Sequence, residues 1–138
     1  MFEAVATVRF TPLDKWIARG EGSHFVLKRL TNATSLFTEA NLNKLQLAAK
    51  QFEGKPYDLT FEWSDERIYC SELVWKLYKN SLNLEVGQPA HLKDFKLDSP
   101  AVQAKLHERY GSHIPLDEPV ISPKAIFNSK LLSTVAQQ

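Results

Sequence analysis

The chain has 138 residues, of which 43% are hydrophobic and 24% charged, and its formal net charge is +1. This length suits one domain with one sizeable core, and the composition excludes a disordered or fibrous protein. The balanced charge argues against nucleic acid or an anionic membrane surface as the main partner. No apolar run approaches the roughly 20 residues that a membrane-spanning helix needs.

Two strands are predicted first along the chain. FEAVATVRF at residues 2–10 alternates large apolar side chains with smaller or polar ones, as a half-buried strand does. Pro12 then opens a short segment that ends in a turn at Gly20 and Gly22. HFVLKRL at residues 24–30 is rich in strand-forming residues and is the second predicted strand.

Two amphipathic helices are predicted next. TEANLNKLQLAAKQFEG at residues 38–54 repeats apolar side chains at helical spacing and ends at a glycine. YCSELVWKLYKNSL at residues 69–82 is the second helix, and the residues that share one of its faces are Cys70, Leu73, Val74, Leu77 and Ser81.

The pattern weakens beyond Gly87. Short helices are predicted near residues 90–95 and 100–110, a proline-punctuated loop at 115–123, and a last segment ending in LLSTV. No internal repeat or linker interrupts the chain. The sequence therefore predicts a single α+β domain over residues 1–138.

Cys70 is the only cysteine, so no disulfide can form within the chain. If its helix begins near Tyr69, the unpaired N–H groups and dipole of the first turn would stabilise a thiolate and an oxyanion. A cysteine on an apolar helix face is more often a core residue, and helical spacing alone favours that interpretation by about two to one. Both interpretations remain open on this pattern.

Two motifs around this cysteine favour the interpretation of Cys70 as a nucleophile over that of a core residue. Gly-Lys-Pro-Tyr-Asp at residues 54–58 and Tyr-Cys-Ser-Glu-Leu-Val at residues 69–74 resemble the NlpC-type papain-like amidohydrolases. Segments from FEAV and TPLDKWIARGE to VQAKLHERYG and ISPKAIF resemble the circularly permuted branch of that family, in the same order. The resemblance implies a permuted papain-like fold, in which a small antiparallel sheet packs against helices that include the cysteine-bearing one.

The resemblance also implies roles for three residues. Cys70 would be the nucleophile, and Glu3, in the strand FEAV, would be the third polar residue that orients the base. Tyr57 would lie beside the cysteine in the substrate or oxyanion region. This division of labour is chemically consistent, because a base holds the thiolate as an ion pair and a third group fixes the imidazole. No metal or organic cofactor is implied.

The base histidine of the family belongs to a strand before FEAV, and no segment here matches it. The four histidines, His24, His91, His107 and His113, are scattered and show neither the catalytic pattern nor metal-ligand spacing. We therefore expect an N-terminally incomplete domain whose base comes from elsewhere. A sheet lacking a strand exposes its edge, so we also expect a homodimer through that edge, which sedimentation would test.

The predicted function is a thiol hydrolase or acyltransferase that forms an acyl-enzyme on Cys70. Its substrate would be an amide or ester in a peptide, a cell-wall component or a lipid-linked molecule. The alternative is a non-catalytic binding domain that keeps the papain-like cleft but has lost its base, so the pattern leaves open whether the chain is an enzyme. A structural domain with a buried Cys70 is the third hypothesis. The resemblance implies a periplasmic location, which the chain itself does not specify.

Overall fold

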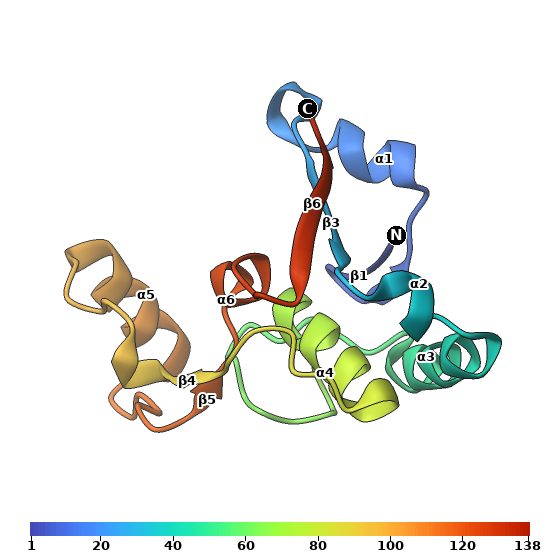
Figure 1. Ribbon diagram of the computed structural model, residues 1–138. Coiled ribbons are helices and arrows are strands. Elements are labelled where there is room, and N and C mark those ends of the chain that lie inside the picture. The colour runs from blue at the N-terminus through green and yellow to red at the C-terminus, as the bar shows by residue number, and fades with distance from the viewer.

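The computed structural model describes residues 1–138 and combines six α-helices with three two-stranded sheets (Figure 1). In chain order the elements are β1 (Phe2–Ala4), β2 (Val8–Phe10), α1 (Leu13–Ala18), η1 (Glu21–Ser23), β3 (Val26–Leu30), α2 (Ala33–Leu36), α3 (Glu39–Phe52), α4 (Cys70–Leu82), β4 (Ala90–His91), η2 (Leu92–Asp94), α5 (Pro100–Tyr110), β5 (Pro119–Val120), α6 (Pro123–Phe127) and β6 (Leu132–Gln137). The predicted α+β class is confirmed. None of the helices combines the length and apolar character needed to cross a membrane.

The N-terminal segment forms a hairpin. β1 pairs antiparallel with β2, which places Phe2 opposite Phe10. The single strand predicted over residues 2–10 is therefore wrong, because the chain reverses between the two short strands. The reversal lets Ala4 and Val8 be buried side by side, which a straight strand of this length would not allow.

The other two sheets join distant parts of the chain. β3 pairs antiparallel with β6, so that Leu30 lies opposite Leu132, and this ribbon extends away from the α3–α4 layer (Figure 1). β4 pairs with β5, beside α5 and on the opposite side of α4 from α3 in that view. Each sheet has only two strands, and two-stranded ribbons have unpaired outer edges. The homodimer expected through a sheet edge remains a prediction.

The main core lies where α4 packs against α3 and β1. Its buried side chains are Ala4, Val8, Phe52, Ile68 and Leu73. A second buried cluster consists of Leu30 from β3, Ala33 from α2 and Val86, which follows α4. The helical spacing in the sequence correctly placed the helices that contribute to the main core, and this core supports the start of α4.

Gly87 lies where the chain after α4 passes α6. Its φ is +88°, and a Cβ there would lie 2.8 Å from the carbonyl carbon and oxygen of Ala125. We expect Gly87→Ala to lower the free energy of unfolding by about 2–4 kcal/mol, because left-handed strain and a backbone clash add. Gly54 has a φ of +82°, but a Cβ there would meet no atom beyond its chain neighbours within 4 Å, so Gly54→Ala should cost only about 1–2 kcal/mol. Urea unfolding compares the two, and equal losses would contradict the clash.

Candidate active site

Cys70 is the first residue of α4, and its side chain is exposed. Its neighbours Tyr69 and Ser71 are buried, as is Leu73 one turn of the helix further on. The helix therefore presents the thiol to the surface at its N-terminal end. The core interpretation of Cys70 is wrong, and so is the hypothesis of a structural domain with a buried cysteine.

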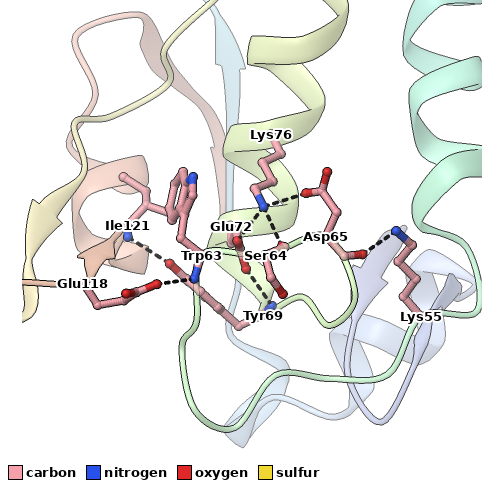
Figure 2. Close-up of polar contacts among 9 residues, drawn as sticks. All are labelled: Lys55, Trp63, Ser64, Asp65, Tyr69, Glu72, Lys76, Glu118 and Ile121. Atoms are coloured by element: carbon pink, nitrogen blue, oxygen red, sulfur yellow. Dashed lines mark hydrogen bonds and ion pairs between the residues drawn. The ribbon is translucent and has the colours of Figure 1, made fainter. Parts of the chain in front are cut away.

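The start of α4 is fixed by contacts with Ile121, which lies far along the chain. The Tyr69 hydroxyl accepts a hydrogen bond from the Ile121 N–H at 3.0 Å, and the Ser71 hydroxyl donates to the Ile121 carbonyl at 2.8 Å. Figure 2 shows the first of these contacts. Burial raises the pKa of Tyr69 far above its ordinary value, so its hydroxyl stays neutral. These bonds determine where the helix begins and so where Cys70 lies.

Tyr57 lies beside Cys70. The backbone of Tyr57 pairs with that of Ile68 in a short parallel bridge, and its N–H donates to the Ala6 carbonyl at 3.0 Å. Its hydroxyl is 4.0 Å from the Cys70 sulfur. Burial raises the pKa of Tyr57, and its interaction with the neighbouring Cys70 sulfur raises it further. The hydroxyl is therefore a protonated donor directed at the sulfur.

Glu3 lies on β1, two positions from the hairpin turn. Its carboxylate accepts hydrogen bonds from the Thr11 hydroxyl at 2.6 Å and from Nη2 of Arg19 at 2.8 and 2.6 Å. Burial raises the pKa of Glu3, but these hydrogen bonds and the Arg19 charge outweigh burial and lower it. The carboxylate thus stays ionised, and neither a hydrogen bond nor an ion pair joins it to Cys70 or Tyr57.

The histidines make their contacts elsewhere. Nδ1 of His107 lies 3.0 Å from the Gly111 carbonyl oxygen, and Nδ1 of His113 lies 3.1 Å from the neighbouring Ser112 hydroxyl. The hydrogen bond to the Cys70 sulfur comes from Tyr57 and from no histidine. No group of three or more His, Cys, Asp or Glu side chains comes close enough to hold a metal ion.

A buried ion pair joins Glu72 and Lys76, which lie one turn apart in α4 (Figure 2). Glu72 is fully buried, and its Oε1 lies 2.8 Å from Nζ of Lys76. The same Nζ donates to the Ser64 carbonyl at 2.6 Å and to Oδ1 of Asp65 at 2.7 Å. Burial raises the pKa of Glu72 to about 7, although Lys76 opposes this rise. The sequence predicted an apolar face for this helix but did not predict that the charged side chains of Glu72 and Lys76 would be buried. Their spacing of four residues, which suits an ion pair on a helix, could have indicated the pair.

The loop between α3 and α4 is held by a buried carboxylate. Asp58 is fully buried, and its Oδ1 accepts hydrogen bonds from the Thr60 N–H at 2.7 Å and from the Thr60 hydroxyl at 2.8 Å. The Tyr110 hydroxyl donates to the Thr60 carbonyl. Asp58 therefore shapes this loop, and Tyr110 ties the loop to the end of α5.

Phe61 follows in this loop with a φ of +52°, a left-handed conformation that costs a bulky residue about 1–3 kcal/mol. Its ring packs edge-on against Tyr69, with the ring centres 5.1 Å apart. Cζ of Arg109, from α5, lies 5.1 Å from the centre of the Phe61 ring. Sequence reasoning missed both residues, because the contact between them depends on how α5 packs against the loop.

Comparison with known proteins gives three matches. A family model described as permuted papain-like amidase enzyme, YaeF/YiiX, C92 family, matches residues 1–136. YiiX of Escherichia coli (strain K12), described as uncharacterized, is 51% identical over 138 residues, which are all of this chain and 67% of that protein. The crystal structure of yiiX from Escherichia coli O157:H7, described as a metalloprotein, matches with a TM-score of 0.91 and 50% identity, covering 99% of this chain and 74% of that one.

Proposed function

Because the chain belongs to the YaeF/YiiX (C92) family of permuted papain-like amidases, we propose that Cys70 is the nucleophile of an amide hydrolase. One observation carries the proposal: the only cysteine is exposed at the first residue of a helix, with the Tyr57 hydroxyl 4.0 Å from its sulfur. A nucleophile at a helix N-terminus gains from the dipole and from unpaired N–H groups.

The reaction would proceed through a thioester. The Cys70 thiolate attacks the carbonyl carbon of the substrate, and the Cys70 N–H and the Tyr57 hydroxyl donate to the oxyanion. The amine or alcohol leaves after taking a proton from the base. Water or another acceptor then gives a proton to the base and attacks the thioester, which breaks the C–S bond, releases the acid or an acyl-transfer product and restores the thiolate.

The base would be an imidazole supplied from outside the 138 residues, as the family pattern implies. β1 hydrogen-bonds to β2 within its sheet, and its other edge could pair with the strand that carries this histidine. Glu3 lies on β1 with an ionised carboxylate and is proposed to orient the imidazole. In this proposal residues 1–138 form one domain.

The substrate would be an amide or ester of a peptide, cell-wall or lipid-linked molecule, and the location would be periplasmic. One related structure is described as a metalloprotein. The side chains of this chain do not fit such a role, because no three potential ligands come together. No step of the proposed reaction therefore runs through a metal.

Acylation of Cys70 by an activated ester tests the proposal. Incubation with p-nitrophenyl acetate near pH 6.5 is expected to add one acetyl group, located by mass spectrometry on the peptide that contains Cys70. Acylation should be faster in the folded chain than in urea, because only the folded chain places the N–H groups of the helix N-terminus and the Tyr57 hydroxyl where the oxyanion forms. Equal rates in both states would instead support the binding domain that has lost its base.

A further inference from the structure

We propose that Arg109 binds an anionic group of the substrate, so that the molecule attacked by Cys70 carries a carboxylate or phosphate near its scissile bond. This inference rests on the proposed function of Cys70 and specifies its substrate class. Arg109 lies in the last turn of α5 and is exposed. Guanidinium groups bind both anions through paired N–H donors, which makes arginine suited to this task.

The charge of the Arg109 guanidinium is not paired with a carboxylate in the structure. It makes neither a hydrogen bond nor an ion pair, whereas the carboxylate of its neighbour Glu108 is held by Lys105 at 2.9 and 2.7 Å. Its one specific contact is with the ring of Phe61, 5.1 Å away. A guanidinium that contacts an aromatic ring keeps its N–H donors available to a ligand.

This contact connects Arg109, through Phe61, to the residue that precedes the cysteine. The Phe61 ring packs against Tyr69, which immediately precedes Cys70. Burial raises the pKa of Tyr57, and the charge of Arg109 works against that rise. The positive charge therefore acts on the hydroxyl that lies beside the Cys70 sulfur, by a route independent of the Phe61 contact.

The end of α5 that carries Arg109 is tied to the loop that carries Phe61. The neighbouring Tyr110 hydroxyl is bonded to the carbonyl of Thr60, next to Phe61 in the loop. Two carboxylates lie near the Tyr110 hydroxyl, since the negative charges of Glu118 and Glu62 both raise the pKa of Tyr110. Glu118 already accepts a hydrogen bond from a backbone N–H at 2.6 Å. Arg109 is thus a cation without a hydrogen-bonded partner, placed against Phe61 in the loop that leads to the proposed nucleophile.

Alkylation of the single thiol tests the proposal without a known substrate. Iodoacetate and iodoacetamide both react with the Cys70 thiolate, forming a C–S bond and releasing iodide, but only iodoacetate is an anion. In Arg109→Gln, we expect the rate constant for iodoacetate relative to that for iodoacetamide to fall about 3- to 10-fold. Because the ratio compares two reagents on the same protein, a change in the reactivity of the thiolate itself cancels from it, and Arg109→Lys should keep most of the preference.

Arg29→Gln is the matched control, because it removes the same charge from an exposed position on β3. It should leave the ratio unchanged, and added salt should lower the ratio in the unsubstituted protein more than in Arg109→Gln. The same ratio in the unsubstituted protein and Arg109→Gln, or an equal fall in Arg29→Gln, would overturn the proposal. If iodoacetamide reacts with the folded chain no faster than with the unfolded chain, the proposal that Cys70 is a nucleophile fails. The ratio of the iodoacetate and iodoacetamide rate constants would still decide the role of Arg109.

Discussion

In the protein that includes the proposed base, replacing Cys70 by alanine is expected to lower the rate of activated-ester hydrolysis by about 10³-fold or more, to the background of the buffer. The proposed thioester cannot form without the sulfur, and the chain has no second cysteine to replace it. Spectrophotometric release of p-nitrophenol measures the loss. The side chain is exposed, so the free energy of unfolding should change by no more than about 0.5 kcal/mol.

Tyr57→Phe is the companion variant for this experiment. It keeps the thiol and the aromatic ring and removes only the hydroxyl that lies 4.0 Å from the sulfur. Loss of one oxyanion donor should lower the rate about 10- to 100-fold, less than loss of the nucleophile. Hydrolysis that is undiminished in Cys70→Ala would remove Cys70 from the mechanism, and an unchanged rate in Tyr57→Phe would remove the hydroxyl.

Replacing Lys76 by methionine is expected to lower the free energy of unfolding by about 3–5 kcal/mol at pH 8. The substitution leaves the fully buried carboxylate of Glu72 without its cation. It also removes the hydrogen bonds to Ser64 and Asp65, which hold the loop before α4 (Figure 2). Urea unfolding at fixed pH measures the loss.

This loss should depend on pH in a definite direction. Burial raises the pKa of Glu72 from an ordinary value of 4.5 to about 7, so between these values the folded chain holds a proton that the unfolded chain releases. The stability from this proton is fully present below about pH 4.5 and is lost as the pH rises through about 7. We therefore expect Lys76→Met to cost least near pH 5, where Glu72 is neutral, and most at pH 8.

Two further variants make the result specific. Adding Glu72→Gln to Lys76→Met should recover part of the lost stability at pH 8 and flatten its pH dependence, because no buried charge remains. Lys79→Met removes a cation from the same helix, where Lys79 makes a more exposed ion pair with Glu85, and should cost less than about 1 kcal/mol. A loss in Lys76→Met that does not vary with pH, or an equal loss in Lys79→Met, would contradict this account of the buried pair.

Local sequence patterns determined the main elements and the family. Apolar residues at helical spacing located α3 and α4, and strand-forming residues located β3. The motifs around Tyr57 and Cys70 identified the permuted papain-like fold, which the family match confirms. These features could be predicted because helix periodicity and short motifs involve residues close together in the chain.

Only the tertiary structure decided which side chains are buried and which lie together. Helical spacing placed Cys70 on the apolar face, but contacts of Tyr69 and Ser71 with the distant Ile121 leave the thiol exposed at the helix end. Packing of α5 against the loop likewise brings Arg109 against the ring of Phe61. These contacts join segments far apart in the sequence, and no local periodicity records which segments will meet.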